Sequence, residues 1–501
     1  MKRYIRIVML SGLLSGGMLS VSSCSLDPEQ SSKVDNEKSP IRTVEELEAG
    51  IIGSYARMTS SMYYGRDMII FSESRAPYAY STGVSGRFDN ISGFTLQTTH
   101  AYPRDTWNQI YRVIANTNRV LEAELGSDKG LVDYFKGQGY IIRALAHYDL
   151  MRLYGEQYVN NTGLTALGIP YITKFGQTKA EVQRQTVASN KQAIFQDLDL
   201  GIELMKNSLD NAKSKESRVK INLSAAYALK SRIALFFAHY DSTLYNVVAE
   251  SASLSIKEAN RMNVSVAPRA GFLDGYKSEA VAQNSIFEFA QSGTDHSGVN
   301  SLFYIYNVFA NGGGYGDVIW NGDVTSVFPE VMDGLNSLDI RQDVVTKDYQ
   351  GVLRNTGKFT AMSSNIKMLR IEEVMFNYME AAVKGASNAD KGVALNYLNT
   401  IVSNRVLLVD PKIANDAGKP KTYIALDFET VKKERTKELM FEGLGYEDVM
   451  RWEGVIKNPK TDVNTNLSTK GEVRYGDVLT AFPIPISEIN VSKIDQNQGY
   501  K

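Results

Sequence analysis

Cysteine is almost absent from this sequence: Cys24 is the single one in 501 residues. An intrachain disulfide is therefore excluded, and the stability of the fold must come from packing. An excess of charge of one sign is also lacking, because 55 Lys and Arg residues face 56 Asp and Glu residues. This balance provides no general attraction to nucleic acid or to an anionic lipid surface. After Cys24 no apolar run reaches the roughly 20 residues needed to cross a bilayer.

Histidine is scarce, and the four present (His100, His147, His239 and His296) form no close ligand pair. His147 and His239 lie in apolar segments, which is typical of hydrogen-bonded core histidines rather than of metal ligands. No Gly-x-Ser-x-Gly motif is present. The glycine-rich run after Asn311 lacks the Gly-Lys-Ser/Thr of a phosphate-binding loop. No motif supports a lipid-anchored hydrolase, and we expect neither a cofactor nor a bound metal.

The N-terminus has the pattern of a bacterial lipoprotein signal. Lys2 and Arg3 precede a modest apolar run, and two serines stand directly before Cys24. The pattern predicts a signal peptide over residues 1–23 and a lipid on the thiol of Cys24, which would tether the chain to a membrane. The alternative is a transmembrane anchor with a buried free cysteine, but glycines and serines interrupt the run. Residues 24–41 are polar, contain two prolines, and are expected to form a flexible tether.

Helical periodicity dominates residues 42–501, which we expect to form a single, mostly α domain. Thr43-Val-Glu-Glu is a capping-box pattern that predicts a helix start. Apolar spacings of three, four and seven predict paired helices over 107–125 and 131–154, 190–208 and 222–239, and 372–384 and 391–405, with another over 428–440. Strand signals are few, at 285–289 and 367–371. The pairs favour either stacked helix–turn–helix units or a generic helical domain.

Aromatic residues gather where helical periodicity stops. We expect an irregular excursion over about residues 270–365, in which the stretch 293–329 shows no clear helix and is rich in glycine, asparagine and aromatic rings. A sugar has apolar C–H faces and hydroxyl edges, so a sugar site needs flat rings with amides or carboxylates beside them. These rings therefore mark a candidate glycan site, and core packing beneath long loops is the alternative for each ring.

Four segments carry motifs that periodicity does not explain. They are Cys24-Ser-Leu-Asp-Pro28; residues 139–155 followed by Gly168-Ile-Pro-Tyr171; residues 433–443 running on to Asp448-Val-Met-Arg-Trp452; and Phe482-Pro-Ile-Pro485 with Gln496-Asn-Gln-Gly-Tyr500. Together, and in this order, they resemble the SusD/RagB family of outer-membrane lipoproteins of Bacteroidetes.

The resemblance implies four tetratricopeptide-like helix pairs that form a scaffold, packed against an irregular, loop-rich part with few short strands. Members of the family lie on TonB-dependent outer-membrane barrels of the SusC type, and they pass captured glycans, or in some cases peptides, into the barrel. They are not enzymes. For this chain the resemblance implies a lipid-anchored outer-membrane protein at the cell surface with a glycan or oligosaccharide ligand and no nucleic-acid partner. Peptide capture and a non-binding helical scaffold are the alternatives.

Ligand residues vary within the family, so the resemblance implies only a location: the loops before the first signature helix and the middle excursion. The candidate ligand contacts in these places are Tyr78, Tyr80, Trp107, Tyr315 and Trp320. Trp107 begins a predicted helix and is equally well explained as a core residue.

Charged residues of the signature segments are expected to build the scaffold: Arg143, Arg152, Glu434, Arg435, Glu438 and Arg451. Glu434 and Glu438 stand four residues apart on one helical face, where like charges repel. Arg435 lies beside them, and Arg451 is expected to fold back. The hypothesis is a partly buried charge network that fixes the last long helix to the body.

Overall fold

The computed structural model describes residues 40–179, 181–309, 313–322, 327–328, 337–410, 412–461 and 471–501. Ile41–Lys501 cluster as one unit. The predicted signal peptide, Cys24 and nearly all of the predicted tether lie outside the described residues. Within the described ranges, no helix combines the length and the apolar character needed to span a membrane.

Helices supply most of the regular structure, as the sequence predicts. Their bounds are α1 (Val44–Met58), α2 (Asp67–Glu73), α3 (Asp89–Ser92), α4 (Ala101–Leu121), α5 (Lys129–Tyr154), α6 (Val187–Ala212), α7 (Leu223–Ala238), α8 (Leu244–Arg261), α9 (Leu302–Tyr306), α10 (Ile371–Val383), α11 (Lys391–Ser403), α12 (Phe428–Leu439), α13 (Gly445–Arg451) and α14 (Ile486–Ser492). The strands are short: β1 (Ala79–Ser81), β2 (Ser285–Phe289), β3 (Val318–Trp320), β4 (Ser337–Asp339), β5 (Val345–Lys347), β6 (Leu353–Asn355), β7 (Ile366–Arg370), β8 (Val406–Leu408), β9 (Lys419–Pro420), β10 (Val455–Ile456) and β11 (Val473–Arg474).

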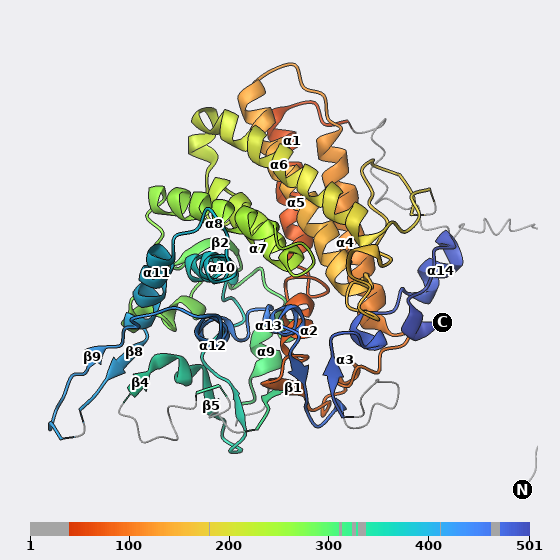
Figure 1. Ribbon diagram of the computed structural model, residues 1–501. Coiled ribbons are helices and arrows are strands. Elements are labelled where there is room, and N and C mark those ends of the chain that lie inside the picture. Colours follow the sequence, from red (N-terminus) through yellow and green to blue (C-terminus); the bar gives the residue numbers. More distant parts are fainter. Residues whose placement is uncertain are drawn as a thin grey trace, which may run out of the picture. The chain divides into compact units, whose positions relative to one another are not determined.

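The long helices pack in chain order, each against the next. α4 contacts α1 and α5, α5 contacts α6, and α7 contacts α8. α10 continues the array by packing on α8, and it also contacts α11 and α12. Figure 1 shows this progression from the orange α4 and α5 through the green α7 and α8 to the blue α11 and α12. Contact between successive helices builds one continuous core, as in helical repeat proteins.

The contact between α5 and α6 is close because two glycines face each other. α5 is buried along most of its length because it lies between α4 and α6. A Cβ added to Gly137 would stand 2.8 Å from the carbonyl oxygen of Gly201, and a Cβ on Gly201 would stand 2.8 Å from that of Gly137. Side chains at these positions would push the two helices apart.

Helix starts and most helix pairs follow the predictions. The Thr43 hydroxyl accepts a hydrogen bond from the N–H of Glu46, whose carboxylate accepts one from the N–H of Arg42, so the predicted cap of α1 is confirmed. The pairs predicted at 107–154 and 372–405 are α4 with α5 and α10 with α11. The third predicted pair is only a minor contact, because α6 packs chiefly on α5 and α7 chiefly on α8.

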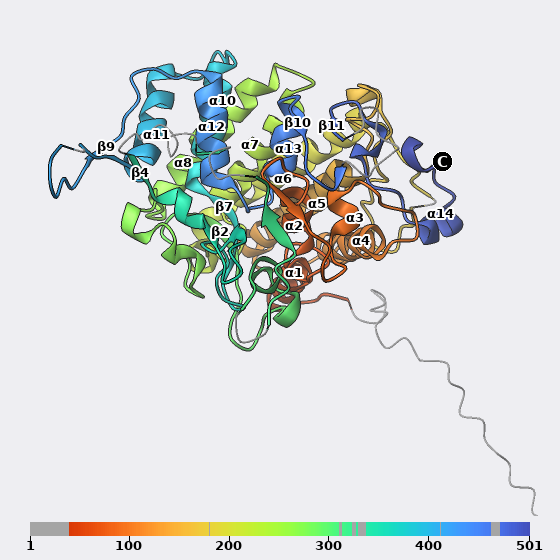
Figure 2. The ribbon, with the colours of Figure 1, turned by 90° about the horizontal axis from the view of Figure 1, so that it is seen from below.

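The strands form small ribbons rather than a central sheet. β2 pairs with β7 where the sequence predicts strands. Within the predicted excursion, β5 pairs with β6, and β3 pairs with β1, which lies outside the excursion. The short helix α9 lies in a stretch where no helix was expected. β4, β8 and β9 form a three-stranded ribbon. Figure 2 shows β4 and β9 at one end of the unit and α14 at the opposite end.

Candidate functional site

The antiparallel ribbon of β1 and β3 joins the two regions in which the resemblance places the ligand site. Tyr80 pairs with Ile319, and the flanking pairs are Ala79 with Trp320 and Ser81 with Val318. Burial alternates along both strands, so that Tyr80 and Ile319 are half-buried while their strand neighbours are buried. Tyr80 is therefore a predicted ligand contact whose ring reaches the surface.

Tyr78 and Trp320 are two predicted ligand contacts whose rings are buried in the core. Their rings stack with centroids 5.7 Å apart, and both contact Phe441. They expose only 5% and 3% of their surface. The Tyr78 hydroxyl donates a hydrogen bond of 2.7 Å to Glu73, and burial raises the pKa of this hydroxyl. Both rings help to hold the ribbon on the body of the protein.

Glu73 anchors the loop that carries Tyr78. Its carboxylate accepts hydrogen bonds of 2.7–3.1 Å from the backbone N–H groups of Phe441, Gly443 and Leu444. Gly443 has φ +85°, a conformation that favours glycine and lets successive N–H groups converge on one anion. Burial raises the pKa of Glu73, while these donors lower it. The residues before β1 are thereby tied to the segment that follows α12.

Trp107 lies in the core. Its ring has no exposed surface, and it packs edge-on against Tyr111 and Tyr154. The indole N–H donates a hydrogen bond of 3.0 Å to Glu488. Of the two explanations that the sequence left open, core packing fits these surroundings.

Tyr315 is half-buried in an aromatic cluster of the excursion, which we call the excursion cluster: Phe303, Tyr304, Phe309 and Tyr315. Neighbouring ring centroids in this cluster are 4.9–6.3 Å apart. The guanidinium carbon of Arg87 lies 3.6 Å from the centroid of the Tyr315 ring. This cation–π contact fixes the ring and occupies one of its faces.

Two hollows flank these aromatic residues. The first, of about 320 Å³, is lined by Tyr80, Thr82, Asp89, Gly93, Thr95, Pro459 and Lys460. The second, of about 400 Å³, is lined by Asn307, Val308, Phe309, Asp348, Tyr349, Arg354 and Thr356. Tyr349, 57% exposed, was not among the predicted residues. Tyr349 lies in the turn between β5 and β6. In the sequence, only its position next to Gln350 and Gly351 could have suggested an exposed ring in a turn.

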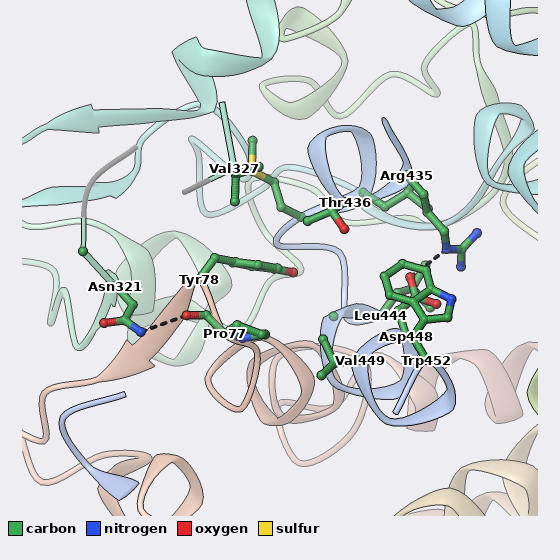
Figure 3. A pocket seen from close by; sticks show the side chains of 14 residues that line it. Pro77, Tyr78, Asn321, Val327, Arg435, Thr436, Leu444, Asp448, Val449 and Trp452 are labelled. Atoms are coloured by element: carbon green, nitrogen blue, oxygen red, sulfur yellow. Dashed lines mark hydrogen bonds and ion pairs between the residues drawn. The ribbon is translucent and has the colours of Figure 1, made fainter. Parts of the chain in front are cut away.

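A third pocket, of about 420 Å³, lies where the residues before β1 meet α12 and α13 (Figure 3). Its lining includes Pro77, Tyr78, Asn321, Val327, Leu439, Met440, Leu444, Val449 and Trp452. Most of these side chains are apolar, and Arg435, Thr436 and Asp448 add polar groups to the lining.

The signature arginines 143 and 152 pair with buried carboxylates. Arg143 binds Asp197 through two hydrogen bonds of 2.7 and 2.6 Å. Arg152 contacts Asp149 at 2.9 Å and Glu447 at 2.7 Å. The pair of Arg143 with Asp197 joins α5 to α6, and the pair of Arg152 with Glu447 joins α5 to α13. The pair of Arg152 with Asp149 lies within α5. These arginines therefore serve the scaffold.

A buried charge network surrounds α12, with partners other than those the sequence suggested. Glu434 accepts a hydrogen bond of 2.7 Å from Arg341, and Glu438 accepts one of 3.0 Å from Arg405. Arg435 points elsewhere and donates to Asp448 at 2.6 Å. Arg451 also binds Asp448, at 2.8 Å. A charge network that holds α12 to the body is therefore present, as the hypothesis proposed, and within it each glutamate pairs with an arginine from a distant segment rather than with Arg435 or Arg451.

Two observations concern the metal-ligating residue types in the described part of the chain. Among the described residues, no group of three or more His, Cys, Asp or Glu side chains is arranged to hold a metal ion. Burial lowers the pKa of His147 to about 3, and its Nε2 accepts a hydrogen bond of 2.9 Å from the N–H of Ile172. His147 is thus confirmed as a hydrogen-bonded core histidine.

Two family models match separate parts of this chain. The model described as "Starch-binding associating with outer membrane" matches residues 33–235, and the model described as "SusD family" matches residues 349–500. SusD-like protein P2 of Formosa agariphila is 22% identical over 354 residues, which cover 70% of this chain and 64% of that protein. The chain thus spans less than two thirds of the length of this curated relative.

Solved structures share the fold over nearly the whole chain. A SusD superfamily protein from Bacteroides vulgatus has a TM-score of 0.77 at 23% identity and covers 92% of this chain and 100% of its own. A putative sugar binding protein from the same species has a TM-score of 0.75 at 24% identity, with coverage of 92% and 99%. Surface glycan-binding protein A from Bacteroides fluxus has a TM-score of 0.68 at 17% identity, with coverage of 92% and 100%. These similarities show the helical fold with sparse strands.

Proposed function

Because the chain belongs to the SusD/RagB family, we propose that it is a cell-surface lipoprotein that binds glycans or oligosaccharides and delivers them to a TonB-dependent outer-membrane barrel of the SusC type. The lipid is carried by Cys24, and the unit Ile41–Lys501 binds the ligand. The role is capture and transfer without catalysis. Two similar structures, a putative sugar binding protein and a surface glycan-binding protein, support a glycan as the ligand.

The observation that carries the proposal is a partly exposed aromatic surface beside two hollows. We use the name aromatic surface for two groups of rings: Tyr80 beside the first hollow, and the excursion cluster with Tyr349 beside the second. Flat rings offer stacking surface to the C–H faces of a sugar. Polar groups stand next to them: the Asn307 amide lines one hollow, and the pair of Lys460 with Asp89, 2.6 Å apart, lines the other. A sugar has apolar C–H faces and hydroxyl edges, so its recognition requires aromatic rings with polar groups beside them.

The test is a binding screen of purified protein against polysaccharides, oligosaccharides and a peptide library. Tyr80→Ala and Tyr349→Ala are each expected to weaken saturable glycan binding roughly 5- to 30-fold, because losing one stacked ring removes about 1–2 kcal/mol. Tyr397→Ala, at a half-buried tyrosine of α11, is the matched control and should bind as the unchanged protein does.

Each contrary outcome of the screen has a defined meaning. Peptide binding without glycan binding would replace the glycan with a peptide as the ligand. Absence of both would contradict capture and leave a scaffold role. Metabolic labelling with palmitate, lost in Cys24→Ala, tests the anchor. Co-purification of a barrel from membranes with the tagged protein tests delivery.

A further inference from the structure

The pocket between the residues before β1 and the helices α12 and α13 shares no lining residue with the two hollows beside the aromatic surface. We propose that it binds an apolar aromatic substituent carried by the captured glycan, such as an aryl ester. This inference rests on the proposed function, and it adds a substrate class: glycans decorated with aromatic groups. The aromatic surface would hold the sugar rings, and the pocket would hold the decoration.

The walls of the pocket suit a flat, uncharged ring. Figure 3 shows Tyr78 and Trp452 on opposite sides of the pocket, with Val449 between them along one wall. Aliphatic groups of Leu439, Met440 and Leu444 add further apolar surface to the lining. Aromatic rings pack favourably against other rings in edge-on or offset geometry. The hydroxyls of a sugar ring in this place would face mostly apolar walls, and burying them without hydrogen-bond partners is costly.

Charged residues of the wall are balanced among themselves. Arg435 binds Asp448 at 2.6 Å, and Arg451 binds the same carboxylate at 2.8 Å. Arg451 also pairs with Glu380. The positive charges of Arg435 and Arg451 are therefore balanced by the negative charges of Asp448 and Glu380, and the network as a whole is neutral. A neutral ligand group is favoured over an anion or a cation.

The volume leaves room for more than a single ring. An apolar cavity of about 150 Å³ is enough to hold benzene. The pocket measures about 420 Å³, which accommodates a substituted ring with its ester linkage. Its rim is continuous with the ribbon, because Tyr78 precedes β1 and Asn321 follows β3. A glycan on the outer face at Tyr80 and Ile319 would therefore lie a few residues from the pocket mouth.

Ethyl ferulate, a neutral aromatic ester, is the first probe, with binding measured by calorimetry on the purified protein. We expect saturable binding that falls at least about tenfold in Val449→Trp, because the new ring fills the pocket. Val393→Trp places the same side chain at an exposed valine of α11 and should leave binding unchanged. Thr436→Phe fills the pocket from α12 and is a second variant in case Val449→Trp does not fold.

Three outcomes would overturn the pocket assignment. They are absence of saturable probe binding, binding that both filling variants leave intact, and an equal loss in Val393→Trp. Binding of a phenylalanine peptide that depends on Val449, without binding of ethyl ferulate, would assign the pocket to a peptide side chain and also overturn the proposal.

Feruloylated arabinoxylan, in native and alkali de-esterified forms, tests the substrate class. The native form should bind at least about tenfold more tightly, and this difference should vanish in Val449→Trp. Equal binding of both forms would overturn the decorated-glycan inference and leave the proposed function standing. Failure of every glycan in the screen, with ethyl ferulate still bound, would overturn the proposed function and leave only the aromatic pocket.

Discussion

Trp107 of α4 reaches the C-terminal segment through one hydrogen bond and packs against α5 through a ring contact. Its indole N–H donates to Glu488, a residue 381 positions away in the chain. Its ring is enclosed by Tyr111 and Tyr154 and has no exposed surface. The residue therefore contributes to stability through packing and through satisfaction of a buried donor.

We predict that Trp107→Ala lowers the free energy of unfolding by about 3–5 kcal/mol, because it leaves a large cavity. Glycan affinity of the folded fraction should not change. Urea unfolding and a binding titration of the same sample measure the two quantities. Tyr80→Ala should show the opposite pattern, with weakened binding and stability within about 0.5 kcal/mol of the unchanged protein. A stable Trp107→Ala protein with weakened binding would return Trp107 to the ligand site.

The sequence could locate the aromatic regions but could not rank the rings within them. Tyr78 and Tyr80 are two residues apart, one just before β1 and one within it, yet Tyr78 is buried against Phe441 and Tyr80 reaches the surface. The difference comes from a partner more than 300 residues away, which no local pattern reveals. Tyr349 was missed for the complementary reason, because a single tyrosine in a turn carries no periodic signal.

At the scale of elements, a close contact between two helices involves residues without side chains. Gly137 of α5 and Gly201 of α6 approach so nearly that a Cβ on either would stand 2.8 Å from the other's carbonyl oxygen. The obstacle is backbone, which cannot rotate aside as a side chain can.

Gly201→Ala is expected to destabilise the protein by about 1–3 kcal/mol through overpacking. The sign is informative, because alanine in a helix is otherwise favoured over glycine by about 1 kcal/mol. Gly53→Ala in α1 is the control: its new Cβ would have its nearest neighbour, Asn116 Nδ2, at 3.8 Å, so stabilisation is expected. Thermal unfolding of the three proteins makes the comparison, and equal shifts for both variants would refute the close-packing explanation.

Element prediction failed at α8 for a related reason. The buried face of α8 consists largely of small residues such as Ala252, Ser255 and Ala259, so a search for large apolar residues at helical spacing passes over it. Small residues let α7 approach closely, and the hydroxyls of Ser224 and Ser255 donate to each other's backbone carbonyl oxygens at 2.8 and 2.9 Å. Without α8, the sequence paired α7 with α6. Helices with large apolar residues, such as α4 and α10, were found.

At the scale of the whole unit, the charge network around α12 joins segments far apart in the chain. Arg341 follows β4, Arg370 ends β7, and Arg405 follows α11. All three contact Glu434 or Glu438, whose side chains have no exposed surface. The network therefore links the excursion, one strand ribbon and the end of the helical array, and losing one carboxylate affects all three.

This network predicts how stability depends on pH. Burial opposes ionisation of Glu434, but Arg341 and Lys437 outweigh it and lower the pKa of Glu434 from 4.5 to about 2. Arg405 and Arg370 likewise hold the pKa of Glu438 well below its usual range, against the effect of burial. Since the unfolded state takes up protons first as the pH falls, the stabilisation is complete above about pH 4.5 and is lost progressively towards pH 2.

Glu434→Gln should therefore lower the free energy of unfolding at pH 7 by about 3–5 kcal/mol, because Arg341 is left buried with one carboxylate fewer. It should also make the decline in stability between pH 5 and pH 3 shallower, because one group that titrates in this range has been removed. Glu429→Gln, on the exposed side of the same helix, should change neither quantity appreciably. Urea unfolding at pH 7, 5, 4 and 3 measures both effects. An unchanged pH slope in Glu434→Gln would show that other carboxylates control acid unfolding, and that α12 is held mainly by apolar contacts.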